Sequence, residues 1–155
     1  MAATLTILID SREQKPYNLP NSKIVTLPHG DYSIEGAGNY GITIERKTHE
    51  DIYGCIAQSR ARFERELEHL ARYKYAAIVI ETDLPRFLTP PPYSGVHPKS
   101  AIGSVLAWSV KYRLPVFFAG SRRHGQALTR KLLEKFWQYS QEVGDGALTS
   151  GANLR

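Results

Sequence analysis

The stretch from Gly30 to Asp51 reads GDYSIEGAGNYGITIERKTHED, and its pattern sets the expected fold. Residues 32–34 are a short strand, and residues 36–41 form a glycine-rich hairpin turn. Residues 41–46 (GITIER) alternate between apolar and polar side chains, which is typical of a strand with two different faces. Thr48 fits the N-cap of a helix because an acid follows three residues later. We therefore expect a β-hairpin that leads directly into a helix.

The segments on either side of this stretch predict an α/β sandwich around one mixed sheet. Apolar or alternating runs indicate further strands at residues 4–9, 23–27, 76–80 and 115–119. Helical periodicity covers residues 48–73, 99–112 and 121–139. Loops are expected at residues 11–21 and 84–98, both of which contain prolines. We expect one domain at residues 1–140 and a flexible C-terminal tail at residues 141–155, where no periodicity is present.

Composition narrows the class of protein. The chain has 155 residues, a net charge of +5 and one cysteine, Cys55. A single cysteine excludes an internal disulfide and a zinc cluster of cysteines, so we expect an intracellular protein in the cytoplasm or nucleoid. No leader peptide or membrane-spanning run is visible, so we expect no membrane partner. The net charge is −2 over residues 1–45 and +6 over residues 111–135, so acids and bases are segregated.

The acids of the N-terminal third gather where predicted strands begin or end, and a divalent metal ion is one reason for such a cluster. Asp31 precedes one strand and Glu45 lies at the end of the next. Lys47 follows Glu45 by two residues, so both side chains point to the same face of a strand. Asp10 ends the first strand, and Glu13 follows it. Four acids near one lysine predict a site for Mg²⁺ or Mn²⁺ that hydrolyses a phosphodiester.

Three motifs together resemble the XPF-type nuclease family. They are Asp10-Ser11-Arg12-Glu13, Gly30-Asp31-Tyr32 and Glu45-Arg46-Lys47-x-x-x-Asp51. This family is a branch of the restriction-endonuclease-like superfamily, whose fold is a three-layer α/β sandwich with a central mixed sheet. Its members use Mg²⁺ or Mn²⁺ to cut branched or flapped DNA. The resemblance therefore implies the same fold and the same reaction for this chain.

The resemblance also implies roles for individual acids and for one lysine. Asp31 and Glu45 match metal ligands and belong to the catalytic set. Asp10 and Glu13 match acids that help to bind the metal or organise the site. Lys47 matches the catalytic lysine, which orients water or steadies charge that builds on the phosphate.

Two further residues of the motif carry open alternatives. Asp51 matches the last acid of the catalytic motif, but a capping box at Thr48 explains it equally well. Arg46 matches a catalytic arginine near the scissile phosphate, but it points opposite to Glu45 and Lys47, so a structural ion pair is an equal alternative. Arg12 and Arg62 match arginines expected to contact DNA.

The sequence departs from the family pattern in supporting positions. Glu66 stands where the family often has glutamine, and Cys55 stands where serine is common. No helix-hairpin-helix or helicase module is recognisable in these 155 residues. Targeting to a junction by such a module is therefore not expected from this chain.

The basic segment of residues 111–135 has two interpretations. It is either a solvated helix face or a surface that binds the DNA backbone. The candidate DNA contacts are Arg122, Arg123, Arg130 and Lys131. The same helix carries a wide apolar surface, which predicts a homodimer through the C-terminal helices and consists of Leu128, Leu132, Leu133, Phe136 and Trp137.

These observations predict a metal-dependent DNA endonuclease for branched, flapped or junction DNA, of the kind used in DNA repair and recombination. The main alternative is a non-catalytic DNA-binding subunit or a scaffold of a nuclease complex. A different nuclease activity on the same fold and a protein-interaction module are further alternatives. Dependence of cleavage on metal and on DNA shape discriminates among them.

Overall fold

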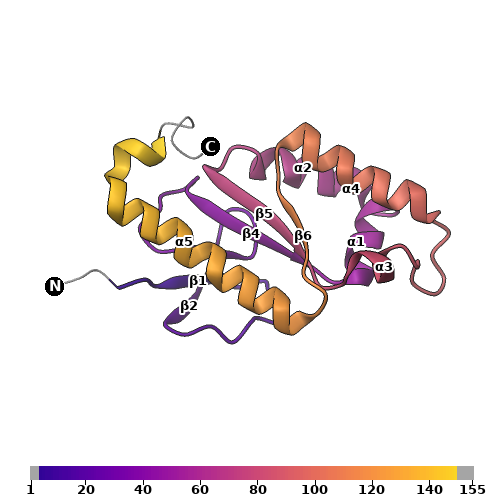
Figure 1. The fold of residues 1–155 in the computed structure, drawn as a ribbon, viewed down its shortest axis with the longest axis horizontal. Coiled ribbons are helices and arrows are strands. Elements are labelled where there is room, and N and C mark those ends of the chain that lie inside the picture. The colour runs from indigo at the N-terminus through magenta and orange to yellow at the C-terminus, as the bar shows by residue number, and fades with distance from the viewer. Residues whose placement is uncertain (1–3, 150–155) are drawn as a thin grey trace.

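A computed structural model describes the backbone of residues 4–149 and the side chains of residues 4–141. The described residues form a sheet of six strands in the order β2-β1-β3-β4-β5-β6 (Figure 1). In chain order, the strands are β1 (Ile7–Asp10), β2 (Ser22–Val25), β3 (Tyr32–Ile34), β4 (Ile42–Lys47), β5 (Tyr75–Ile80) and β6 (Val116–Phe118).

The sheet is mixed, as the sequence predicts. Strand β3 is antiparallel to both β1 and β4. Strand β2 is parallel to β1, and β4, β5 and β6 run parallel to one another. Because parallel strands end at the same edge, the C-terminal residues of β4 and β5 lie side by side, with Lys47 opposite Ile80. Glu45 and Lys47, two of the predicted site residues, lie at this edge.

Helices cover both faces of the sheet. In chain order, they are α1 (His49–Ile56), α2 (Arg60–Leu70), α3 (Leu84–Phe87), α4 (Pro98–Tyr112) and α5 (Arg122–Thr149). One core cluster joins β5 to α1, α2, α3 and α4, and the other joins β1, β3, β4 and β5 to α5. Figure 1 shows α5 apart from the other helices. No helix of the described residues is long and apolar enough to cross a membrane.

Strand β5 explains how the two cores share one sheet. Ala76, Ile78 and Ile80 pack into the core beneath α1, α2 and α4. Ala77 and Val79 pack into the core beneath α5. Because both faces of a central parallel strand are covered, its sequence YAAIVI is continuously apolar instead of alternating.

The structure corrects three expected element boundaries. The helix expected at residues 48–73 is two helices, because it ends at Ile56 and restarts at Arg60. A short helix, α3, lies inside the expected loop at residues 84–98. Helix α5 continues to Thr149, beyond its expected end at residue 139, and residues 150–155 of the expected tail lie outside the described residues.

Candidate active site

The pairing of β3 with β4 brings two carboxylates together. Tyr32 lies opposite Ile44 in this antiparallel pair, so the next residues along the register, Asp31 and Glu45, also face each other. The Asp31 amide donates to the carbonyl of Ile44 over 2.9 Å, and the Arg46 amide donates to Asp31 Oδ2 over 2.7 Å. The backbone of β4 therefore holds the Asp31 carboxylate in place.

Gly30 makes this approach possible. Its φ of +77° is a conformation that side chains disfavour. A Cβ atom at Gly30 would lie 1.9 Å from Thr43 Oγ1, which is far inside van der Waals contact. The glycine of the GD motif is thus required by the position of the aspartate that follows it.

Asp31, Glu45 and Lys47 form a charged group in which Glu45 is buried and the other two are half-buried. Burial raises the pKa of Asp31 to about 8, and the neighbouring Glu45 carboxylate adds to this effect. Burial also raises the pKa of Glu45, and Lys47, whose Nζ lies 3.2 Å from Glu45 Oε2, offsets this only in part. The pKa of Lys47 is raised because Glu45 outweighs the effect of burial. The group favours an additional cation.

A cavity of about 500 Å³ opens beside Glu45 and Lys47, between the end of β4 and helices α1 and α2. We call it the catalytic pocket because Glu45 and Lys47, which the sequence predicts as catalytic residues, line it. Its charged lining residues are Glu45, Lys47, Glu50, Asp51, Arg62 and Glu66. Four acids against two bases produce a negative potential, which attracts divalent cations before it attracts a phosphate.

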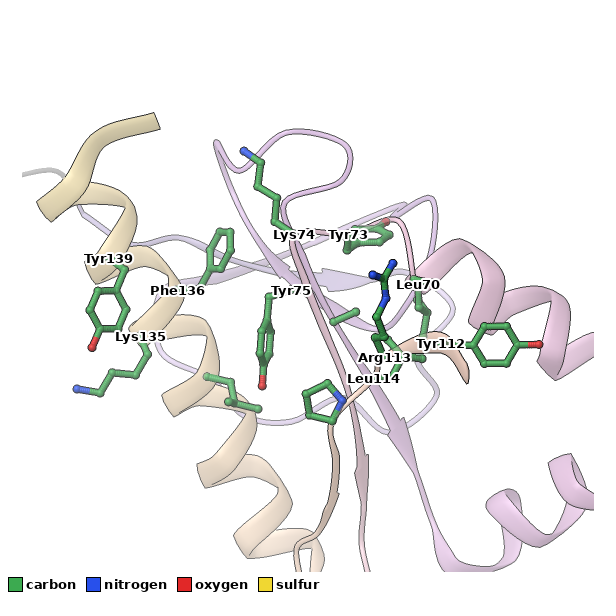
Figure 2. Close-up of a pocket in the computed structure, with 14 residues that line it drawn as sticks. Leu70, Tyr73, Lys74, Tyr75, Tyr112, Arg113, Leu114, Lys135, Phe136 and Tyr139 are labelled. Carbon is green, nitrogen blue, oxygen red and sulfur yellow. The ribbon is translucent and has the colours of Figure 1, made fainter. Parts of the chain in front are cut away.

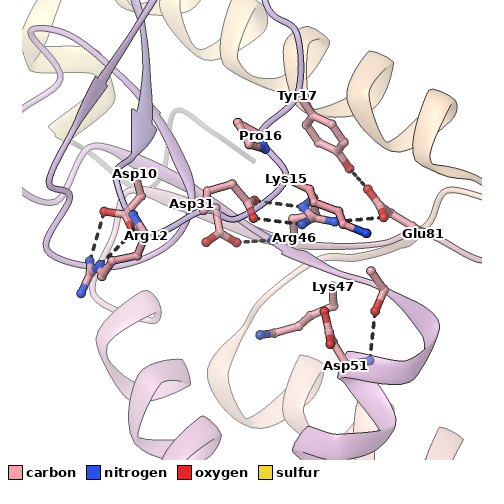
Figure 3. A network of polar contacts seen from close by, with 12 residues as sticks. Asp10, Arg12, Lys15, Pro16, Tyr17, Asp31, Arg46, Lys47, Asp51 and Glu81 are labelled. Atoms are coloured by element: carbon pink, nitrogen blue, oxygen red, sulfur yellow. Dashed lines mark hydrogen bonds and ion pairs between the residues drawn. The ribbon is translucent and has the colours of Figure 1, made fainter.

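Arg46 lies on the opposite face of β4, as its alternation with Glu45 and Lys47 predicts (Figure 3). Its side chain is 8% exposed. It donates to both carboxylate oxygens of Glu13 over 2.9 Å and to Glu81 over 3.1 Å. Of the two interpretations left open for Arg46, the geometry favours the structural ion pair.

The four acids expected around one ion do not all gather. Both Glu13 oxygens are taken by Arg46, on the face away from the pocket. Asp10 accepts from the Arg12 guanidinium and from the Leu27 amide, each over 2.9 Å, and these bonds hold its pKa below its usual value although burial opposes them. Among the described residues, no cluster of three or more His, Cys, Asp or Glu side chains is arranged to hold a metal ion.

Four residues that line the catalytic pocket were predicted as site residues from the sequence, namely Glu45, Lys47, Asp51 and Arg62, and a fifth, Glu66, was not. Asp51 lines the pocket while its amide donates to Thr48 Oγ1 over 3.1 Å, so it is also part of the predicted helix cap. Arg62 lines the pocket and is exposed. Glu66 was noted only as a departure from a family pattern, yet it contacts the Gly30 amide and His29, both at 3.3 Å. Its position one helical turn after Arg62 is the signal that places it there.

The four residues of α5 that are expected to contact DNA differ in whether their side chains already bind other groups of the chain. Arg122 donates to the carbonyls of Lys15 and Pro16 over 2.8 and 3.0 Å, so it fastens the loop after β1 to α5. Arg130 and Lys131 both reach Glu134, but these exposed pairs are weak and open readily. Arg123 is exposed. Arg123, Arg130 and Lys131 are therefore available to contact a phosphate backbone.

The apolar surface expected for dimerisation is mostly used inside the chain. Leu133 and Phe136 are buried in the core beneath α5, and Leu132 and Trp137 pack against that core. Leu128 is half-buried. A single helix covers this face of the sheet, so it needs a wide apolar stripe for its own packing.

A second cavity, of about 550 Å³, lies at the other end of β5, where Tyr75 begins the strand (Figure 2). Tyrosines and aliphatic side chains line it, with Lys74, Arg113 and Lys135 as the charged residues. The described residues that line it include no carboxylate, so it has no ligands for a hard cation.

The structure is thus an α/β domain with a mixed sheet between two helical layers, and it carries two carboxylates and a lysine at the ends of adjacent strands. The chain belongs to the ERCC4 domain family, which matches residues 9–132. The predicted resemblance to XPF-type nucleases and the predicted three-layer fold are both confirmed.

Two solved structures are similar in fold. XPF from Aeropyrum pernix matches with a TM-score of 0.65 and 18% identity, over 84% of this chain and 60% of that one. XPF from Aeropyrum pernix in complex with DNA matches with a TM-score of 0.61 and 19% identity, over 90% of this chain and 66% of that one. This chain therefore spans about three fifths to two thirds of these relatives. No match was found among curated proteins.

Proposed function

We propose that this chain is a metal-dependent DNA endonuclease that cuts branched, flapped or junction DNA. The observation that carries the proposal is the placement of Asp31 opposite Glu45, with Lys47 beside them, at the edge of a negatively charged pocket. Membership of the ERCC4 domain family supports a nuclease, and the DNA complex of the Aeropyrum pernix relative supports DNA as the partner.

The residues present fit Mg²⁺ or Mn²⁺. Asp31 and Glu45 offer oxygen ligands, and burial and mutual repulsion raise the pKa of Asp31, which a nearby cation would reverse. Mg²⁺ accepts one or two protein carboxylates and takes its other ligands from water and phosphate, so two acids suffice. Such an ion, when bound, supplies Lewis-acid charge to the scissile phosphate.

The chain's own groups supply the remaining steps. Lys47 is held beside Glu45, where its ammonium can orient the attacking water and balance charge that builds on the phosphate. Water adds to phosphorus and releases a proton to solvent as the P–O bond to the leaving sugar oxygen breaks, and that oxygen takes up a proton from solvent. Arg62, which is exposed in the pocket wall, would hold a neighbouring phosphate.

The proposal also includes a set of basic residues that contact the DNA backbone and a homodimer of this chain. Arg12, 65% exposed in its side chain, and Arg123, Arg130 and Lys131 are the remaining candidate backbone contacts. A homodimer through α5 would use Tyr139 and the half-buried Leu128, Leu132 and Trp137, because Leu133 and Phe136 are in the core. Sedimentation velocity over a range of protein concentrations tests this part of the proposal, and a monomer at every concentration contradicts it.

The test of function is cleavage of a labelled panel of single-stranded, duplex, flap, splayed-arm and four-way junction DNA. Each is incubated with Mg²⁺, Mn²⁺ or EDTA. We expect metal-dependent cutting that falls by about 100-fold or more in Asp31→Asn and in Lys47→Ala. Lys23→Ala, which removes the same charge as Lys47→Ala but from an exposed position on β2, is the matched control and should cut like the wild type. DNA binding without cutting under any metal would instead favour the non-catalytic subunit.

A further inference from the structure

A groove beside the catalytic pocket has no role in the proposed reaction. It measures about 410 Å³ and lies between α1 and the loop at residues 91–95. Its lining includes Tyr93 from the loop and Gln58, which follows the C-cap of α1, and Gly54 and Ala57 are small lining residues on the α1 side. Glu50 and Gly54 line both this groove and the catalytic pocket, so the two spaces adjoin. We call it the side groove.

Tyr93 is presented in an unusual way. It is the most exposed large apolar side chain of the described residues, at 107%. Its φ of +73° is one of three positive values among the described non-glycine residues, and this conformation costs roughly 1–2 kcal/mol for an L-residue. Prolines 90–92 precede it and restrict the loop, and the Ser94 amide donates to the carbonyl of Pro91 over 3.1 Å. The fold therefore holds an aromatic ring out in solvent without any packing gain.

The lining chemistry selects the type of ligand. Of the described residues that line the side groove, Glu50 alone carries a charge, and it would repel a phosphate. The Gln58 amide offers both a donor and an acceptor, and two prolines and a tyrosine offer flat apolar surface. A flat, neutral group with hydrogen-bonding edges fits this combination, and a nucleobase is such a group.

We propose that the side groove binds one unpaired nucleobase, which stacks on Tyr93, while the phosphate of the same strand lies in the catalytic pocket. This inference rests on the proposed nuclease function and adds a feature of the substrate. A base inside a duplex is covered by its neighbours in the stack, so only an unpaired or extruded base reaches the groove. The groove thus selects for DNA with a single-stranded nucleotide next to the cleaved bond.

Binding is measured in the Asp31→Asn background, where cleavage does not interfere, with splayed-arm DNA and with a duplex of the same length. We expect Tyr93→Ala to weaken binding of the splayed-arm DNA by about five- to 100-fold and to leave duplex binding unchanged. Tyr93→Phe keeps the ring and should bind like the parent. Ala57→Leu, which fills the groove from α1 without altering Tyr93, should reproduce the loss. Ile24→Ala removes an exposed apolar side chain from β2 and is the matched control.

A second readout reports stacking itself. 2-Aminopurine is placed at each nucleotide that flanks the cleavage position, and its fluorescence should be quenched at one of them by the parent and by Tyr93→Phe but not by Tyr93→Ala. Equal losses on duplex and splayed-arm DNA, or wild-type behaviour of Tyr93→Ala, would overturn the inference while leaving the nuclease intact. Failure of the wild-type chain to bind or cut any DNA would overturn the proposed function instead.

Discussion

The guanidinium of Arg46 forms two parallel hydrogen bonds of 2.9 Å with the carboxylate of Glu13, and the two side chains are only 8% and 7% exposed. This pair joins strand β4 to the loop that follows β1. Glu81 at the end of β5 and the ring of Tyr17 complete the group. The arginine of the ERK motif therefore fixes the framework on one face of β4, while Glu45 and Lys47 serve the pocket on the other.

Removal of Arg46 should destabilise the fold strongly. Arg46→Met leaves Glu13 and Glu81 buried without their shared cation, and breaking a buried pair in this way costs about 3–5 kcal/mol. Glu13→Gln should cost less, because Glu81 still pairs with Arg46. Urea denaturation measures both. Lys23→Ala, which breaks an exposed pair with Glu35, should change the free energy of unfolding by less than about 1 kcal/mol. A similar small change in Arg46→Met would contradict the structural role.

Replacement of Gly30 should separate backbone strain from steric overlap. Gly30 and Gly38 both have positive φ, but nothing lies within 4 Å of a Cβ built at Gly38. Gly38→Ala should therefore cost only the conformational strain, about 1–2 kcal/mol. Gly30→Ala adds the overlap with Thr43 and displaces Asp31, so it should cost more in urea denaturation and also reduce cleavage. Equal losses of stability in the two variants would show that the close approach to Thr43 is unimportant.

The alternation of GITIER correctly placed the side chains at the end of β4, since a pleated strand allows only two directions. Lys47 lies over the ring of Phe63 on α2, and Arg46 lies over the ring of Tyr17 on the other face. The sequence could not show that Glu13 forms an ion pair with Arg46. That pair joins positions 33 residues apart through a loop without periodicity, so its path depends on tertiary contacts.

Two other details of the structure differ from the sequence predictions for related reasons. The apolar spacing from Ile52 through Ile56 to Phe63 continues across the break between α1 and α2, because both helices bury residues in the same core. Periodicity alone therefore cannot detect the interruption. On α5, Leu133 and Phe136 were expected at a dimer surface, but one helix covers the whole face and uses them itself. Hydrophobicity indicates that a surface is covered, and the topology decides what covers it.

The carboxyl pair should make stability depend on pH in the metal-free protein. Burial and Glu45 raise the pKa of Asp31 to about 8, above its value of about 4 in an unfolded chain. A raised pKa in the folded state means that unfolding is increasingly favoured as the pH rises from about 4 to about 8. Asp31→Asn should remove the contribution of Asp31 to this loss of stability with rising pH. It should therefore raise Tm at pH 8 in EDTA, by about 2–4 °C for each kcal/mol gained in the free energy of unfolding. Thermal unfolding between pH 5 and 9 measures the effect, and parallel curves for the two proteins would contradict it.

Gly125 on α5 should respond to alanine in the opposite sense to an ordinary helical glycine. Alanine normally stabilises a helix by up to about 1 kcal/mol relative to glycine, and Gly103→Ala on α4, where nothing lies within 4 Å, should show this gain. A Cβ at Gly125 would lie 2.5 Å from the hydroxyl oxygen of Tyr17. That hydroxyl donates to Glu81, and its ring stacks on Tyr32 with the centroids 5.1 Å apart, so it cannot move aside freely. Gly125→Ala should therefore destabilise the protein. In a Tyr17→Phe background the overlapping oxygen is absent, so the same substitution should lose most of its cost. A double-mutant cycle in urea provides the test, and an equal effect of Gly125→Ala in both backgrounds would show that contact with Tyr17 does not determine the residue at this position.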